Sequence, residues 1–381
     1  MAKKTLIATL PPMVAGGVTA KAGILASALR DAGHDVTVAF YDLPHAARFA
    51  PTIFGGARAV AVPSLGRWLE QRYTDHSPVW QELIDSHDRH VAVGGTVLIA
   101  NPLAVAGLRH LVWCAADLAG DRGHRWRAMP WWRQAGDAML VSPALMRQQQ
   151  RVLAADNTIH GVSTDTVDRL SAQVTVRVKK IRRLPIPVNT EFFTPDTPGG
   201  GGCRLGFAGR LDDPRKNAEL LFETFAQVRL RDPAAKLMLT GAPTRKLAAM
   251  AARLGIEAAV TFAGELSPDA LRRFYQDLDV FVIASHQEGL AIAGLEAMAC
   301  GVPVVSTRCG GPADYVVDDV SGRLCDFNAL DMAEAVLEIA DPETRPKFSE
   351  AARRTVEETY SFAGFGRNLA RAWRGTWSES P

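Results

Sequence analysis

Two glutamates in a run of small and apolar residues have the spacing and surroundings best suited to chemistry. Glu288 and Glu296 are separated by seven residues, between strand-like runs at 278–284 and 304–307. The pattern predicts a strand, a turn at Glu288-Gly289 and a short apolar helix that carries Glu296 about two turns further on. Eight helical residues rise about 12 Å, which is too far for the two carboxylates to share one proton or one metal ion. They can instead bind two parts of one elongated ligand, with the N–H groups of the helix N-terminus facing an anion between them.

A purely structural interpretation of the same pair stays open. Glu296 lies among Leu295, Ala297 and Met298, where a carboxylate is unfavourable unless it has a partner such as a buried ion pair. Glu288 could cap the helix. The spacing alone does not separate ligand binding from these structural roles.

Two basic residues follow another predicted strand, at 204–208. Arg210 and Lys216 are expected at the carboxyl end of that strand, which is the edge where open α/β sheets bind ligands. The alternative is a solvated loop, because residues 212–215 also carry charges of both signs. The spacing of the Gly-Arg and Lys-Asn pairs favours an anion site.

These segments together resemble a known family. Glu-x7-Glu followed by Ala-Met-Ala-Cys-Gly-Val-Pro-Val-Val (297–305) is similar to the donor-site signature of the retaining glycosyltransferases of family 4. Leu-Gly-Phe-Ala-Gly-Arg-Leu-Asp-Asp-Pro-Arg-Lys-Asn (205–217) resembles the family's phosphate-binding loop, and Cys-Gly-Gly-Pro-Ala-Asp-Tyr-Val (309–316) follows in the family's order. The resemblance is dense from about 155 to 345 and thin before 150. It implies a GT-B architecture, an α/β fold of two Rossmann-like doubly wound parallel-sheet domains facing a central cleft.

The resemblance also implies roles for individual residues. Arg210 and Lys216 would hold the diphosphate of a nucleotide-sugar donor, Glu296 would bind the ribose hydroxyls, and Glu288 would face the donor sugar as a catalytic residue. The backbone N–H groups that would complete the phosphate cradle belong to Gly289, Leu290, Ala291 and Ile292. Gly16-Gly17 resembles the family's N-terminal glycine loop, which approaches the donor and the acceptor. Ala291 stands where the family usually shows a glycine, a proline or a similar small residue.

The expected catalytic position of the first domain departs from the family pattern. Many relatives place a histidine after a middle strand, but the predicted strand 111–114 runs into Ala115-Ala116-Asp117. Asp117 is therefore the predicted catalytic group on this side, with a helix N-cap as its alternative role. His110, at the other end of the strand, and His124, in the predicted loop beyond, are the other candidates.

The order of predicted elements indicates two domains. Predicted strands at 5–10 and 35–40 flank a helix at 18–32 that Gly16-Gly17 opens, as in a doubly wound βαβ unit. Further predicted strands of this half include 97–100 and 138–141. A glycine-rich linker at 197–202 precedes a second alternation of strands and helices. We expect an N-terminal domain at 1–187 and a donor domain at 188–361; the resemblance implies that a helix at 362–381 crosses back to brace the first domain.

Composition excludes several function classes. The 381 residues have a net charge of +2 and contain no run of eighteen apolar residues, so neither a nucleic-acid partner nor a transmembrane helix is expected. Five cysteines without a C-x-x-C pair indicate free thiols, and we expect a cytoplasmic protein. The Arg- and Trp-rich stretch 122–133 suits peripheral contact with the inner face of a membrane, a lipid-linked acceptor or an anionic carbohydrate; packing onto its own domain is the alternative.

The sequence therefore predicts a retaining glycosyltransferase that uses a nucleotide sugar, UDP- or GDP-linked, and a carbohydrate, lipid-linked or small-molecule acceptor. No metal and no cofactor are expected, because cationic side chains and a helix N-terminus can neutralise the diphosphate. The alternatives are a nucleotide-sugar epimerase or hydrolase of the same fold, and an inactive subunit that binds a nucleotide sugar.

Overall fold

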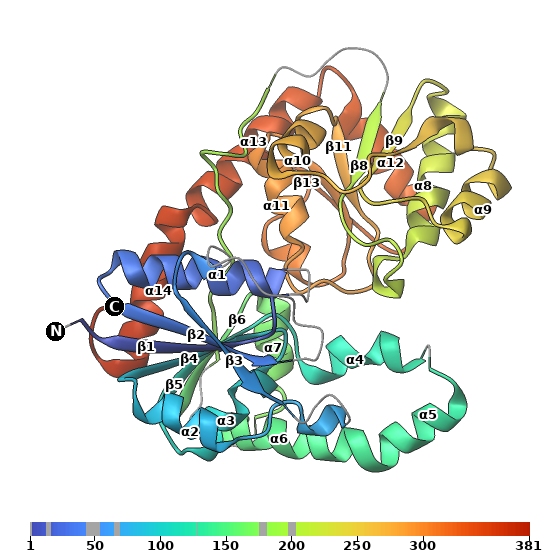
Figure 1. Ribbon diagram of the computed structural model, residues 1–381. Helices are drawn as coiled ribbons and strands as arrows, with labels where there is room; N and C mark the ends of the chain where they lie inside the picture. Colours follow the sequence, from blue (N-terminus) through green and yellow to red (C-terminus); the bar gives the residue numbers. More distant parts are fainter. Residues whose placement is uncertain are drawn as a thin grey trace. The chain divides into compact units, whose positions relative to one another are not determined.

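The computed structural model (Figure 1) describes residues 2–12, 17–42, 54–64, 69–127, 129–174, 181–196 and 203–381. The chain divides into two compact units, and each has its own apolar core. Unit 1 comprises Met1–Pro185 and Gly366–Pro381, and unit 2 comprises Ile186–Phe365. The predicted linker 197–202 and Gly16 lie outside the described residues.

Unit 1 is a parallel sheet of the order β3-β2-β1-β4-β5-β6-β7. Its strands are β1 (Lys4–Thr9), β2 (Asp35–Asp42), β3 (Arg58–Pro63), β4 (Arg89–Gly94), β5 (His110–Cys114), β6 (Asn157–Gly161) and β7 (Arg182–Arg183). Its helices are α1 (Gly17–Asp31), α2 (Pro78–Asp85), α3 (Asn101–Val105), α4 (Leu118–Arg127), α5 (Trp131–Gly136), α6 (Ser142–Ala154) and α7 (Thr164–Ser171). Helix α1 covers one face of the sheet, and α2 and α3 cover the other (Figure 1).

Unit 2 is a parallel sheet of the order β10-β9-β8-β11-β12-β13. Its strands are β8 (Arg204–Phe207), β9 (Lys236–Leu239), β10 (Val260–Phe262), β11 (Val280–Ile283), β12 (Val304–Thr307) and β13 (Gly322–Cys325). Its helices are α8 (Ala218–Arg231), α9 (Arg245–Arg253), α10 (Pro268–Gln276), α11 (Ile292–Ala299), α12 (Ala329–Ala340) and α13 (Arg345–Thr359). Helix α8 packs against α12, and α11 packs against α13.

Both sheets reverse their strand order once. The reversal lies between β1 and β4 in unit 1 and between β8 and β11 in unit 2. In doubly wound sheets the connections leave toward opposite sides at this point, so a crevice forms outside the carboxyl ends of the two strands. The topology therefore designates one candidate ligand site in each unit.

Two predicted strands of unit 1 are wrong. Residues 97–100 form a 3₁₀ helix, and residues 137–141 form a π-helical turn between α5 and α6. All four residues of Val97–Ala100 are buried, and a short buried apolar run has no periodicity that separates strand from helix. The region beyond Asp117, which we expected to be a loop around His124, is helix α4.

The last helix, α14 (Phe362–Trp377), begins in unit 2 and ends in unit 1. Its Trp373 is fully buried, with its ring edge-on to His34 at 5.1 Å between centroids. Beyond the helix, Glu379 forms ion pairs with Lys3 and Arg89, both at 2.7 Å. The end of the chain is thus part of unit 1. In the part of the chain that the structure describes, no helix has the length and apolarity needed to cross a membrane.

We predict that Trp373→Ala lowers the free energy of unfolding by about 3–5 kcal/mol, because it leaves a cavity beneath α14. Urea unfolding should show the loss in the transition of unit 1. The control is Trp131→Ala, at a tryptophan that is 80% exposed, which should change stability by less than about 0.5 kcal/mol. Equal effects of the two substitutions would contradict this account of α14.

Candidate functional site

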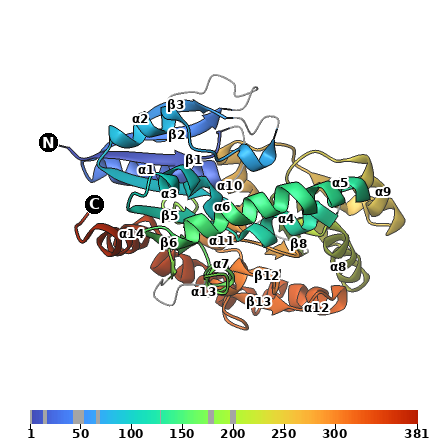
Figure 2. The same ribbon diagram turned by 90° about the horizontal axis from the view of Figure 1, so that it is seen from below.

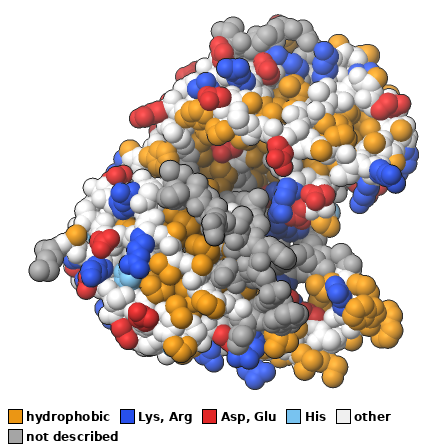
Figure 3. All heavy atoms as spheres, viewed as in Figure 1, with side chains coloured by type: hydrophobic (Ala, Val, Ile, Leu, Met, Phe, Trp, Pro, Cys, Tyr) orange, Lys and Arg blue, Asp and Glu red, His pale blue; other side chains and the backbone are white. Residues whose placement is uncertain are grey.

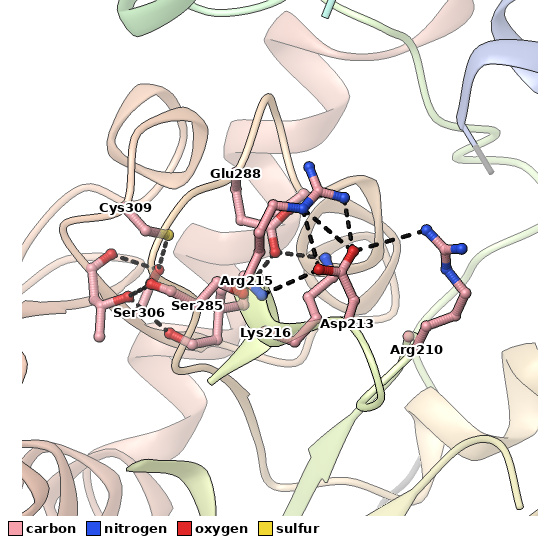
Figure 4. A network of polar contacts seen from close by, with 12 residues as sticks. Arg210, Asp213, Arg215, Lys216, Ser285, Glu288, Ser306 and Cys309 are labelled. Carbon is pink, nitrogen blue, oxygen red and sulfur yellow. Dashed lines mark hydrogen bonds and ion pairs between the residues drawn. The ribbon is translucent and has the colours of Figure 1, made fainter. Parts of the chain in front are cut away.

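The predicted site residues of unit 2 gather at its strand-order reversal. Lys216 lies in the loop after β8, and Glu288 lies in the loop after β11, and these two strands are neighbours in the sheet. Their side chains meet, with the Lys216 ammonium 2.6 Å from Oε1 of Glu288 (Figure 4). The pair therefore bridges the two strand ends between which a ligand is expected.

A buried serine fixes the Glu288 carboxylate from the other side. Ser285 Oγ donates to the same oxygen, Oε1, at 2.6 Å, and the Ser285 carbonyl accepts a hydrogen bond from Thr307 Oγ1 at 2.7 Å. Both of these contacts of the carboxylate are made at Oε1. The second carboxylate oxygen, Oε2, has no hydrogen-bond partner among the described residues, and so it can accept a hydrogen bond from a ligand.

The backbone of Glu288 is held by the loop after β12. Its N–H donates to the Cys309 carbonyl at 2.8 Å, and its carbonyl accepts from Gly311 N at 3.0 Å. A Cβ on Gly311 would lie 2.4 Å from the Gly289 carbonyl oxygen and from the Leu290 Cα, so only glycine allows this approach. The Gly-Gly of the 309–316 motif thus keeps the Glu288 loop in place.

The basic loop after β8 is organised by Asp213. Its carboxylate accepts from the Arg215 backbone N–H at 3.0 Å and from the Arg215 guanidinium at 2.7–3.2 Å. Partial burial opposes its ionisation, but these hydrogen bonds outweigh that effect and hold the pKa of Asp213 below its ordinary value. Arg210 is two-thirds exposed, with its guanidinium 3.8 Å from Asp213 (Figure 4). Its side chain is therefore weakly held and can reach a ligand.

Helix α11 begins at Ile292, four residues after Glu288. Its N-cap, Ala291, has left-handed backbone angles (φ 59°, ψ 67°), a conformation that is unfavourable for a residue with a Cβ. The Tyr315 hydroxyl donates to the Ala291 carbonyl at 3.0 Å. No side chain caps the helix, and its first turn has no acidic residue. The N–H groups of Ile292 and Ala293, which no side chain caps, can thus serve an anion.

Glu296 lies on α11 with a partner of its own. The Tyr275 hydroxyl, from α10, donates to Glu296 Oε2 at 2.8 Å. Burial raises the pKa of Glu296 to about 7, although the Tyr275 hydrogen bond acts in the opposite direction. The two glutamates thus have separate partners, as their spacing predicts. Among the described residues Glu296 forms a hydrogen bond with Tyr275 and no ion pair, so the buried ion pair considered as its structural role is not observed.

Unit 1 has a cavity at its own strand-order reversal, with a volume of about 340 Å³. Its lining includes Leu10 after β1, Thr96 after β4, and Leu118 and Arg122 from α4. Beside this edge, helix α1 starts at Gly17 and buries Lys21, whose ammonium donates to the carbonyls of Gly94 at 2.9 Å and Trp113 at 3.3 Å. Burial lowers the pKa of Lys21 to about 7.

Asp117 makes the contacts of a helix cap. It precedes α4, its Oδ1 accepts from Gly120 N at 3.2 Å, and its Oδ2 accepts from Gln173 Nε2 at 3.1 Å. The residue is only 2% exposed. His110 lies at the amino end of β5, fully buried and hydrogen-bonded to the Leu108 carbonyl, at the sheet edge away from the cavity. The side chain of His124 lies outside the described residues.

Four contributors were not predicted as site residues from the sequence. Ser285 and Tyr275 anchor the two glutamates, Tyr315 holds the Ala291 carbonyl, and Lys21 ties α1 to two strand ends. Ser285 is only three residues from Glu288, and a polar residue ending a buried strand could have indicated it. The other three reach the site from distant elements, and spacing along the chain does not predict such contacts.

Comparison with known proteins gives a consistent result. Residues 200–355 match the sequence model of the family "Glycosyl transferases group 1". A D-inositol 3-phosphate glycosyltransferase from Acidothermus cellulolyticus is 30% identical over 57% of this chain and 53% of its own length. A second protein of that name, from Saccharomonospora viridis, is 29% identical over 64% of this chain and 62% of its own length. The chain thus spans a little over half the length of the curated relatives it matches.

Solved structures share the whole fold. Sucrose-phosphate synthase from Thermosynechococcus elongatus aligns with a TM-score of 0.77 at 18% identity, covering 99% of this chain and all of that one. HepE from Anabaena, solved in complex with UDP and glucose, aligns with a TM-score of 0.75 at 16% identity, covering 98% of this chain and all of that one. At such identities the likeness is evidence for the fold alone. It confirms the predicted GT-B fold class of two Rossmann-like parallel-sheet domains.

The contacts of Asp117 lead to a prediction that separates capping from catalysis. Asp117→Ala should lower the free energy of unfolding by about 1 kcal/mol, whereas Asp117→Asn, which can still cap α4, should preserve it. Melting curves of both variants measure this effect. If Asp117→Asn instead keeps its stability and loses activity about 100-fold, the catalytic role predicted from the sequence is supported.

Proposed function

We propose that this chain, whose residues 200–355 match the family "Glycosyl transferases group 1", transfers a sugar from a nucleotide-sugar donor to an acceptor hydroxyl with retention of configuration. The donor binds at the strand-order reversal of unit 2. The observation that carries the proposal is the Lys216–Glu288 pair, which places a cation and a carboxylate together where β8 and β11 end.

The positive charge suits the leaving group. When the bond between the anomeric carbon and the diphosphate oxygen breaks, the diphosphate keeps the electron pair and gains negative charge. Lys216, Arg210 and the N-terminus of α11 supply the charge and dipole that stabilise it, which is the work a metal ion does in other enzymes. We therefore propose a reaction that needs no metal ion.

The carboxylates suit the sugar parts of the donor. The free Oε2 of Glu288 is placed to accept from a hydroxyl of the transferred sugar, while Lys216 and Ser285 hold the other oxygen. Glu296, just over one turn into α11, binds the ribose hydroxyls, with Tyr275 fixing its orientation. The elongated donor thus lies along the first turn of α11, and its diphosphate lies between the two sugars.

We propose a UDP-linked sugar as the first donor to test, because HepE, whose fold this chain shares, was solved with UDP and glucose. The cavity of unit 1 receives the acceptor. The curated relatives are named for inositol 3-phosphate, so a polyol or sugar phosphate is the first acceptor class to test.

The direct test is to incubate the protein with UDP- and GDP-sugars, with and without candidate acceptors. Release of nucleotide that depends on the acceptor supports transfer. An isomerised donor would show an epimerase, and release without acceptor would show a hydrolase. Thermal stabilisation by nucleotide without any turnover would show an inactive binding subunit, because a ligand that binds only the folded state raises the melting temperature.

We predict that donor affinity rises as the pH increases from about 6 to 8. The ribose hydroxyls donate to ionised Glu296, and burial raises the pKa of this side chain to about 7, so the ionised form, which is the stronger acceptor, is lost as the pH falls below that value. Titration calorimetry with a nucleotide sugar measures this, since its diphosphate is esterified at both ends and does not ionise in this range. Glu296→Gln should bind more weakly at pH 8 and lose the pH dependence; an unchanged slope would contradict the placement of the ribose.

We also predict that Lys216→Ala and Arg210→Ala each lower kcat/KM by roughly 30- to 1,000-fold, corresponding to about 2–4 kcal/mol of lost transition-state stabilisation. Arg210 is mostly exposed and held only by a 3.8 Å contact, so its loss should leave the melting temperature unchanged. Lys246→Ala, at an exposed cation of α9 in the same unit, is the matched control and should keep full activity. Wild-type rates in both variants would refute the assignment of the diphosphate site.

A further inference from the structure

Unit 1 exposes a cluster of large apolar side chains on α4, α5 and α6. Six large apolar residues between 126 and 146 are exposed, and all the exposed tryptophans of the described residues are among them. We call them the apolar patch: Trp126, Trp131, Trp132, Met139, Leu140 and Met146. Trp131 and Met139 are 80% and 76% exposed. Figure 3 shows hydrophobic side chains gathered at the end of unit 1 where α5 lies.

The patch lies on helices that extend beyond the sheet. In both views α4 runs beside the rod formed by α5, the π-helical turn and α6 (Figures 1 and 2). From Trp131 to Val141 this rod buries one side chain, Asp137, whereas the following α6 buries five. The first half of the rod therefore contributes almost nothing to the core of unit 1. The alternative we considered, packing of the Arg- and Trp-rich stretch onto its own domain, does not account for these side chains.

Polar contacts hold helix α4 and the rod together. Arg122 of α4 forms ion pairs with Glu70 and with the buried Asp137, and Ser142 Oγ donates to Asp137 at 2.6 Å. These contacts fix α4 against the rod while its apolar side chains remain outside. A cluster of large exposed apolar side chains on a protein surface typically marks an interaction site.

The charges around the patch suit an anionic partner. Arg127, Arg133 and Arg147 are exposed, and the Arg133 guanidinium lies 5.2 Å from the centre of the Trp132 ring. Asp137, the one acidic residue between 122 and 154, is buried and paired. Tryptophan prefers the headgroup level of a bilayer, and arginine binds phosphate. A second copy of this chain fits poorly, because a patch facing itself would bring arginines against arginines.

We propose that the apolar patch and its three arginines dock unit 1 onto an anionic lipid bilayer. The tryptophans, methionines and leucine enter the headgroup region, and the arginines contact lipid phosphates. Helices α4 and α6 also line the cavity of unit 1 through Leu118, Arg122 and Leu145. Docking therefore brings that cavity close to the lipid surface. The binding itself is independent of the proposed transfer activity.

The test is flotation of the whole protein with phosphatidylcholine vesicles and with vesicles containing about 30% phosphatidylglycerol, at low ionic strength and at about 0.15 M. We expect binding to the anionic vesicles that weakens as salt increases. Trp131→Ser with Trp132→Ser should lower the partition coefficient at least about tenfold on anionic vesicles. Arg127→Glu with Arg133→Glu should abolish the preference for anionic over neutral vesicles.

The matched controls lie in unit 2. Leu230→Ser replaces an equally exposed apolar residue of α8, and Lys246→Glu reverses an exposed cation of α9; both should bind vesicles as the wild type does. All variants should keep the wild-type melting temperature, since the changed side chains are exposed. Absence of vesicle binding at low salt, or equal binding by the tryptophan variant, overturns the proposal. A solution mass that doubles in the wild type and not in the tryptophan variant also overturns it, by assigning the patch to a second copy.

Discussion

The proposed donor site depends on one contact, the ion pair between Lys216 and Glu288. It joins the ends of two neighbouring parallel strands, β8 and β11, at the point where the strand order of the sheet reverses. Each charge is partly buried, and each would be poorly placed without the other. Their mutual attraction keeps a cation and a carboxylate at one point before any ligand arrives. Three other groups of contacts hold this pair in place. The Arg215–Asp213 contact orders the loop that carries Lys216, Ser285 holds the Glu288 carboxylate, and the Cys309-Gly-Gly turn holds the Glu288 backbone.

The residues at this site could be predicted from the sequence, because their place after a predicted strand also gives their place at one edge of the sheet. Arg210, Lys216 and Glu288 each follow a buried strand, and in a parallel sheet all such residues lie along one edge. Tyr275 could not be predicted, because its contact with Glu296 is set by how α10 packs beside α11. The left-handed conformation of Ala291 was not predicted either; its carbonyl accepts a hydrogen bond from the Tyr315 hydroxyl, 24 residues away along the chain.

Unit 1 was harder to predict for a different reason. Its sheet was recognisable from β1, β2, β4 and β5, but Val97–Ala100 and residues 138–141 are apolar runs that turned out helical. The first is buried on every side, so its pattern lacks the alternation that distinguishes a strand. The second is mostly exposed, with Met139 and Leu140 on the surface, so its apolar residues are not evidence of a buried strand. Asp117 was found by position, and its cap contacts depend on how α4 begins.

The path of α14 has a consequence for how the protein is made. The strands of unit 1 are complete by Arg183, but the helix that covers His34 with Trp373 comes after all of unit 2. At 5–20 residues per second, a ribosome needs on the order of 10–40 s to synthesise the residues in between. During that interval the nascent first domain has its sheet but lacks its last helix, and its uncovered apolar face is open to chaperones and to misassociation. A premature stop near the end of the message would thus damage the domain that was translated first.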